Sequence, residues 1–105
     1  VDDVTGYPAQ YKGFDTSDPK EVEIRCPGKW LASVKSPTFV IEGATGNADC
    51  VERMRRTNAN PKVSLLVVRG ADHFSVLAPV NRLLARKILA DTGPACGITL
   101  TEDEA

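Results

Sequence analysis

Two apolar runs of strand length stand out along the chain. The first extends from Thr38 to Ile41 and the second from Val63 to Val68, where every residue except Ser64 is Val or Leu. Apolar runs of this length without alternation are typical of strands that are buried on both faces of a parallel sheet. The pattern therefore predicts two central strands, and Gly70 is the residue expected to end the second one.

Three segments have the signals of helices. Ser17-Asp18-Pro19 supplies a cap and a first-turn proline, and Asn47 can cap a helix from Ala48 to about Arg56. The third helix, Ala78 to Ala90, is preceded by Ser75 as its expected cap. Its apolar stripe consists of Val80, Leu83, Leu84 and Ile88. Because one helix separates the two strands, we predict a parallel βαβ unit with a right-handed crossover.

The other segments are predicted to be less regular. We expect an irregular lead-in over residues 1–18, a further helical turn over Lys29 to Val34 anchored by Trp30, and a short extra strand over Gly97 to Thr101. Residues 102–105 are expected to be a frayed acidic tail. Two strands buried on both faces need neighbours that this chain barely supplies. We therefore expect one domain that is the C-terminal fragment of a larger sheet, with an uncovered sheet surface through which copies can associate.

Composition narrows the classes of partner. The formal net charge is −1, with 26% charged and 42% hydrophobic residues, so we expect neither nucleic acid nor a membrane as a partner. No apolar run approaches the ~20 residues that span a bilayer. The chain has an odd number of cysteines and no Cys-x-x-Cys pair; the three are Cys26, Cys50 and Cys96. They are interpreted as thiols of a reducing compartment, which predicts a cytoplasmic protein.

The only histidine of the chain, His73, follows the second predicted strand. The carboxyl ends of parallel strands are where α/β proteins hold their chemistry, and an imidazole there can act as a general base. The other interpretation is a His that only hydrogen-bonds the turn. Asp72 is expected to stabilise this turn, and a metal site at Asp72 and His73 would lack further ligands. We expect no metal and no cofactor, because the sequence contains neither a phosphate loop nor a dinucleotide fingerprint.

A nucleophile to accompany the base is missing. None of the five serines lies in Gly-x-Ser-x-Gly, the strand-to-helix turn that exposes a hydrolase serine. Ser64 lies within a predicted strand, and no cysteine has a suitable setting. The chain alone is therefore expected to lack hydrolase activity.

Pro37 to Gly43, the helix that follows, Val63 to Phe74 and the closing helix together resemble the C-terminal part of α/β-hydrolases. The most similar branch is that of prolyl oligopeptidases and dienelactone hydrolases, and the resemblance covers roughly Glu21 to Asp91. It implies the C-terminal βαβα part of a doubly wound, three-layer parallel sheet. The triad order of the family is Ser, Asp or Glu, then His, so His73 matches the general base by position.

The position of the acid departs from the family pattern. The family usually has Gly-x-x-Asp after the penultimate strand. In this chain Gly46 occupies the position of that Asp, and the nearest acid downstream is Asp49. Asp49 either takes the role of the triad acid from a lengthened loop or only lies at a helix N-terminus, and Glu42 is a further candidate. The resemblance implies a segment of a serine hydrolase that cleaves a small-molecule ester or a peptide by acyl transfer. The alternative is a non-catalytic α/β-hydrolase-like binding or structural module.

Overall fold

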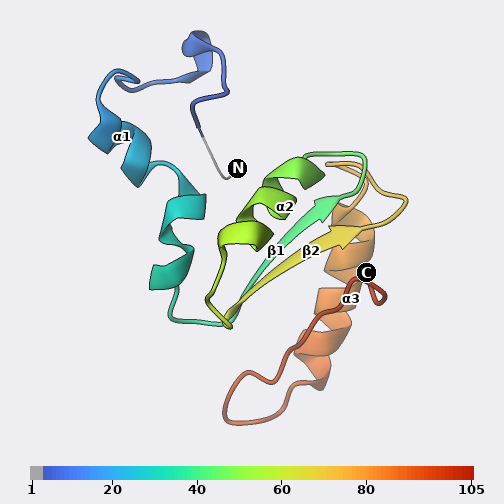
Figure 1. Cartoon of the computed structure of the whole chain (residues 1–105). Coiled ribbons are helices and arrows are strands. Elements are labelled where there is room, and N and C mark those ends of the chain that lie inside the picture. The colour runs from blue at the N-terminus through green and yellow to red at the C-terminus, as the bar shows by residue number, and fades with distance from the viewer. Residues whose placement is uncertain (1–3) are drawn as a thin grey trace.

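The structure is a computed structural model that describes residues 4–105, and the first three residues of the expected lead-in lie outside the described residues. Two strands, three α-helices and two short 3-10 helices follow one another along this part of the chain (Figure 1). In chain order they are a 3-10 helix over Ala9–Tyr11, α1 (Pro19–Ile24), a 3-10 helix over Pro27–Ser33, β1 (Thr38–Gly43), α2 (Ala48–Thr57), β2 (Val63–Val68) and α3 (Leu77–Ala90).

The two strands form a parallel sheet, as the sequence predicts. Thr38 of β1 is aligned with Val63 of β2, and the same register continues to Gly43 and Val68. With α2 between them in the chain, the strands form a βαβ unit, so the α/β class is confirmed at this level. β1 extends two residues beyond the predicted run, because Glu42 and Gly43 continue the ladder.

The two faces of the sheet are covered by different helices (Figure 1). Side chains alternate along β2, so Leu65 packs on the side of α2 and Leu66 on the side of α3. The α2 side contains the cluster of Leu31, Val51, Met54, Val63 and Leu65, with Val40 and Val67 packed against it. The α3 side contains two clusters, one of Val68, Ala71, Val76 and Val80 and one of Leu66, Leu83 and Leu100.

Side chains close the outer edge of β2. Alternate residues of a strand direct their peptide groups to opposite neighbours, and Val63, Leu65 and Val67 point away from β1. Asn58 donates to the carbonyl of Val63 (3.1 Å), Arg55 Nε donates to that of Leu65 (2.9 Å), and a Glu102 oxygen accepts from the amide of Val67 (2.7 Å).

The opposite edge of the sheet, along β1, is open. The peptide groups of Phe39 and Ile41 point away from β2 and make no hydrogen bond to another residue within 4–105. The sheet of the described chain is therefore closed on one side and unpaired on the other.

The C-terminal segment differs from the expectation. The structure has no strand over residues 97–101, because this segment is anchored by the buried Leu100 instead of a backbone ladder. The tail over residues 102–105, expected to be frayed, makes side-chain contacts. Glu102 reaches β2, Glu104 pairs with Lys87 of α3 at 2.7 Å, and Ala105 packs against the α3 clusters.

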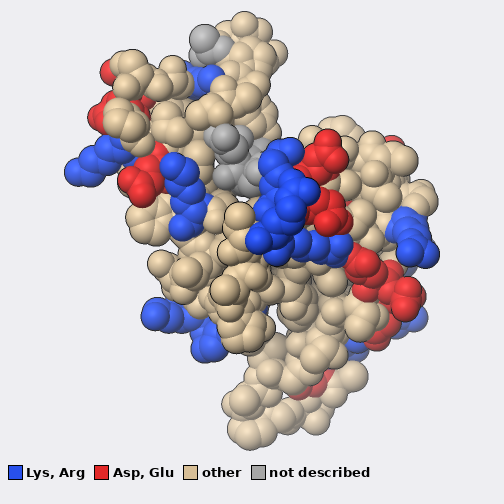
Figure 2. All heavy atoms as spheres, in the orientation of Figure 1, with Lys and Arg blue, Asp and Glu red and all other residues tan. Residues whose placement is uncertain are grey.

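Charged groups of both signs lie next to one another on the face seen in Figure 2. Arg55 of α2 pairs with Glu52 at 2.7 Å and with Glu102 of the tail. None of the helices within residues 4–105 combines the length and the apolar composition needed to cross a bilayer.

Candidate functional site

The candidate site lies at the carboxyl ends of β1 and β2, where the loops that leave the two strands meet. Gly70 follows β2 with a φ of +76°, a conformation that glycine adopts without the steric cost paid by other residues. The chain then passes through Ala71 and Asp72 to His73. The loop after β1 is fastened to this one, since Ala44 donates its N–H to the carbonyl of Val68 at 2.9 Å.

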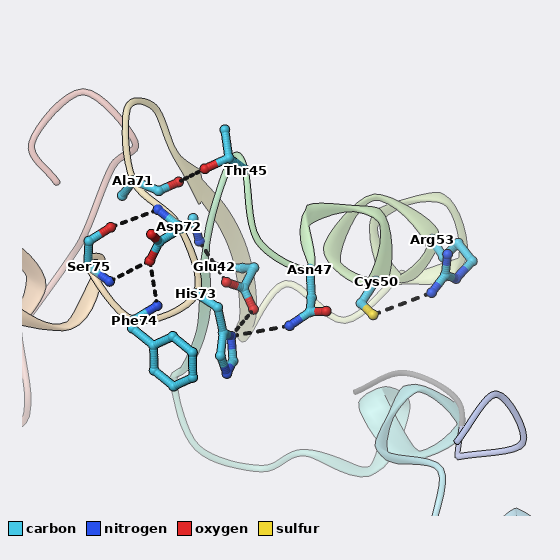
Figure 3. Close-up of polar contacts among 11 residues, drawn as sticks. Glu42, Thr45, Asn47, Cys50, Arg53, Ala71, Asp72, His73, Phe74 and Ser75 are labelled. Atoms are coloured by element: carbon cyan, nitrogen blue, oxygen red, sulfur yellow. Dashed lines mark hydrogen bonds and ion pairs between the residues drawn. The ribbon is translucent and has the colours of Figure 1, made fainter. Parts of the chain in front are cut away.

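Asp72 organises the turn that carries His73 (Figure 3). One of its oxygens accepts from the amides of Phe74 (2.9 Å) and Ser75 (2.8 Å), while the Ser75 hydroxyl accepts from the Asp72 amide (2.8 Å). The hydrogen bonds from Ser75 and Phe74 hold the pKa of Asp72 below its ordinary value of 3.8. The predicted role of Asp72 is thus confirmed, whereas Ser75 belongs to this turn and is not the cap of α3, which follows Val76.

The carboxylate that meets His73 is that of Glu42. Glu42 Oε2 lies 2.9 Å from His73 Nδ1, and Glu42 Oε1 accepts from the amide of Gly43 at 2.9 Å (Figure 3). The residue is only 8% exposed, whereas the side chain of His73 is 55% exposed. One edge of the imidazole is therefore bound to a nearly buried carboxylate, the Phe74 ring packs against it edge to face, and about half of the side chain is exposed to solvent.

Opposing effects determine the ionisation of Glu42. Burial raises the pKa of its carboxyl group, but the hydrogen bonds from His73 and from the Gly43 amide outweigh burial. The pKa is lowered from its ordinary value of 4.5, so Glu42 carries a negative charge at neutral pH.

Two glycines allow the loops to approach this closely. A Cβ at Gly46 would lie 2.6 Å from Glu42 Oε1 and 2.7 Å from the backbone nitrogen of His73. A Cβ at Gly43 would collide with the backbone of Ala71 and Asp72. The glycine at position 46, which breaks the Gly-x-x-Asp pattern, therefore makes room for the pair formed by Glu42 and His73.

Asp49 is placed differently from Glu42. It lies in the first turn of α2, where a carboxylate interacts favourably with the helix dipole. Its side chain makes no hydrogen bond to His73 or to any other residue within 4–105. The reason is geometric: Glu42 leaves the end of β1 beside the loop of His73, whereas the chain has already turned into α2 at Asp49.

Asn47 is the site residue that sequence reasoning misses. It precedes α2, as predicted, but its side chain makes no capping hydrogen bond. Instead, Asn47 Nδ2 lies 3.2 Å from His73 Nδ1. Nothing in the sequence distinguishes these two uses of an Asn at a helix start, because the second depends on a residue 26 positions away.

A cavity of about 270 Å³ borders this group. Glu42, Asn47 and His73 line its polar end, and Val40, Val51 and Met54 contribute apolar wall. No cluster of three or more His, Cys, Asp or Glu side chains suited to a metal ion occurs in the described part of the chain.

The arrangement can support proton transfer. When Nδ1 donates its hydrogen to Glu42, Nε2 keeps its lone pair and can accept a proton from a nucleophile. No serine or cysteine within residues 4–105 is hydrogen-bonded to His73. Comparison of the chain with protein-family models, with curated proteins and with solved structures found no match.

Proposed function

We propose that this chain is the C-terminal part of an α/β-hydrolase-like serine hydrolase, with His73 as general base and Glu42 as the acid that orients it. The observation that carries the proposal is the 2.9 Å contact between His73 Nδ1 and Glu42 Oε2, made from the ends of adjacent parallel strands. A charged carboxylate on Nδ1 stabilises the imidazolium that forms when Nε2 takes the proton of a serine. The same imidazolium returns the proton to the leaving group of an ester or a peptide.

The edges of the sheet support the larger fold in this proposal. The outer edge of β2 is closed by Arg55, Asn58 and Glu102, as expected of the last strand of a sheet. Unpaired peptide groups at Phe39 and Ile41 leave the edge of β1 available for a further strand. The doubly wound, three-layer sheet would continue on the side of β1, with the nucleophile and the oxyanion hole outside the described residues.

The proposal is tested on the full protein that contains this chain, isolated from its source through a tag and treated with a fluorophosphonate. We expect a labelled serine outside the 105 residues of this chain. The isolated chain should neither turn over activated esters nor be labelled. Stoichiometric labelling of one of its own serines would mean that the nucleophile has been misassigned.

Three variants of the full protein assign the roles. His73→Gln should abolish labelling, and Glu42→Gln should lower kcat by about 10⁴-fold, the loss typical of a triad acid replaced by its amide. Asp49→Asn is the matched control, because Asp49 does not contact His73, and it should retain activity. A large loss with Asp49→Asn and a small one with Glu42→Gln would reverse the assignment of the acid.

A non-catalytic module is the second candidate, favoured by the absence of a nucleophile in contact with His73 in the described part of the chain. Folded full protein that no fluorophosphonate labels, and whose His73→Gln variant binds its ligand unchanged, would support this alternative.

A further inference from the structure

Phe74 is a large apolar side chain that the fold leaves in solvent. It is 76% exposed, whereas Ala71 and Val76, on either side of it in the same loop, are buried in the core on the α3 side of the sheet. A single exposed apolar side chain needs no explanation by itself, so the meaning of this one depends on its surroundings. Those surroundings are the candidate site, because Phe74 directly follows His73.

The backbone holds Phe74 in place from both sides. Its amide donates to Asp72 Oδ1 at 2.9 Å, and its carbonyl accepts from the amide of Leu77 at 3.2 Å. The turn that carries His73 therefore also fixes the position of Phe74. An aromatic side chain on an ordered backbone offers contact area at a low cost in conformational entropy, because only two side-chain torsions remain to be fixed.

The Phe74 ring packs against the imidazole of His73. The ring centroids are 5.0 Å apart and the ring planes meet at 75°, the edge-to-face arrangement that aromatic pairs prefer. Glu42 and Asn47 approach the imidazole at Nδ1, and Figure 3 shows Asn47 and Phe74 on opposite sides of the ring. The imidazole thus has polar neighbours at Nδ1 and an apolar neighbour along its other side.

The proposed reaction brings part of the substrate to this side of the imidazole. The serine oxygen bonds to the acyl carbon, the bond from this carbon to the leaving oxygen breaks, and Nε2 passes the proton taken from the serine to the leaving oxygen. During this transfer the leaving oxygen lies about 2.7–3.2 Å from Nε2. Carbon atoms bonded to that oxygen then come within reach of a ring packed on the same imidazole, since apolar contacts extend to about 4.0–4.5 Å.

We propose that Phe74 is a specificity-determining residue of the candidate site, which contacts the leaving group of the substrate and favours esters of bulky apolar alcohols. This inference rests on the proposed function. The Phe74 ring offers an apolar contact and no hydrogen bond, so it favours an aromatic or alkyl alcohol over methanol. It makes no demand on the acyl part of the ester, which leaves the site with the carbonyl and does not receive the proton from Nε2.

The test compares two esters of one acid in the full protein that contains this chain. Methyl acetate and benzyl acetate differ only in the alcohol, and the two alcohols leave with similar ease. In wild-type protein we expect a higher kcat/KM for benzyl acetate. In Phe74→Ala the ratio of kcat/KM for benzyl acetate to that for methyl acetate should fall about fivefold, a factor within the range of one aromatic contact.

Two further variants separate this contact from general effects of the substitution. Phe74→Tyr keeps the ring and should retain the wild-type ratio. Tyr11→Ala is the matched control, because Tyr11 is 72% exposed, similar to Phe74, but does not border the site cavity, and it should leave the ratio unchanged. The preference of wild-type protein for benzyl acetate is a second readout that requires no variant to fold.

The outcomes distinguish the role of Phe74 from the proposed function. Equal losses for the two esters in Phe74→Ala, as expected of a residue that only positions His73, would overturn the inference and leave the proposed hydrolase intact. The same conclusion would follow from a wild-type protein that does not prefer benzyl acetate, or from an equal fall of the ratio in Tyr11→Ala. Absence of both ester turnover and fluorophosphonate labelling would overturn the proposed function and, with it, the role of Phe74.

Discussion

Glu42 keeps its charge in a nearly buried position because hydrogen bonds from the His73 ring and the Gly43 amide replace the water it has lost. Such an arrangement depends on pH. The pKa of Glu42 is lower in the folded chain than its ordinary value of 4.5, so ionisation and folding favour each other. The stabilisation is fully present above that value and is lost as the pH falls through the lower, folded-state pKa.

We therefore expect Glu42→Gln to be less stable than wild-type protein by about 1.5–3 kcal/mol near neutral pH, the usual contribution of a hydrogen bond to a charged group. The difference between the two proteins should shrink as the pH is lowered below 4.5, because wild-type Glu42 then becomes protonated. Urea unfolding followed by circular dichroism at several pH values measures this difference. A gap that stays constant or widens in acid would contradict the role of the ionised carboxylate.

The close packing around Gly46 can be tested by substitution with alanine, and Gly13 provides the control. Gly46→Ala would place a methyl group 2.6 Å from Glu42 Oε1, whereas a Cβ at Gly13 would meet nothing within 4 Å. Overpacking of this kind costs about 1–3 kcal/mol, so we expect a lower melting temperature for Gly46→Ala and little change for Gly13→Ala. Equal melting temperatures for the two variants would show that the loop adjusts without cost.

Roles that depend on near neighbours could be predicted at the residue scale, and roles that depend on another loop could not. The turn-forming role of Asp72 follows from the sequence, since its partners, Phe74 and Ser75, lie two and three residues further along the chain. The choice among Glu42, Asp49 and Asn47 depends on where the loops after β1 and β2 meet. Asp49 is the nearest acid downstream of the position where the resembled family has its Asp, but Glu42 makes the contact because β1 continues through it.

At the scale of elements, the apolar periodicity predicts most of the boundaries. β2 has both its predicted ends, and α3 begins one residue before its predicted start. The exception is the strand expected over residues 97–101. A strand there needs a free neighbouring edge, but β2 already has its outer peptide groups bonded to side chains, a closure that no local pattern reveals.

The packing of β2 against α2 gives a prediction at this scale. Leu65 is 8% exposed within the α2-side cluster, whereas Leu89 at the end of α3 is 83% exposed. Leu65→Ala should cost about 2–4 kcal/mol through the cavity that it leaves. Leu89→Ala should change stability by less than about 0.5 kcal/mol. Chemical denaturation of both variants measures the contrast, and a cost of less than 1 kcal/mol for Leu65→Ala would contradict its placement in a packed core.

The contact between the tail and β2 also depends on charge. The hydrogen bond from the Val67 amide, followed by that from Arg55, lowers the pKa of Glu102 from its ordinary 4.5. Glu102→Gln should therefore speed hydrogen exchange at the Val67 amide relative to wild-type protein, and the difference should fade as the pH drops below 4.5 and the wild-type carboxylate becomes protonated. The amide of Leu66, which faces β1, serves as the internal control. Identical exchange at Val67 in the two proteins would show that the tail does not hold this edge.

At the scale of the whole molecule, the sheet has unlike edges. The composition of the strands predicts an incomplete sheet, and in the described chain the outer edge of β1 is the one with unpaired peptide groups. We expect the isolated chain to self-associate through the edge of β1 at high concentration. Sedimentation velocity should detect larger species, and the amides of Phe39 and Ile41 should exchange more slowly as the concentration rises. Sedimentation and exchange that are independent of concentration would exclude association at this edge.

The parallel register of β1 and β2 has a consequence for how the molecule reaches its native state. Side chains alternate with a period of two, so slipping β1 by one residue would turn Glu42 from the α2 face toward the α3 face. In such a misfolded alignment the carboxylate would be buried among apolar side chains without His73 or the Gly43 amide to satisfy it. The hydrogen bonds of Glu42 therefore stabilise one alignment only, and the group that can carry the chemistry also selects the correct pairing as the chain folds.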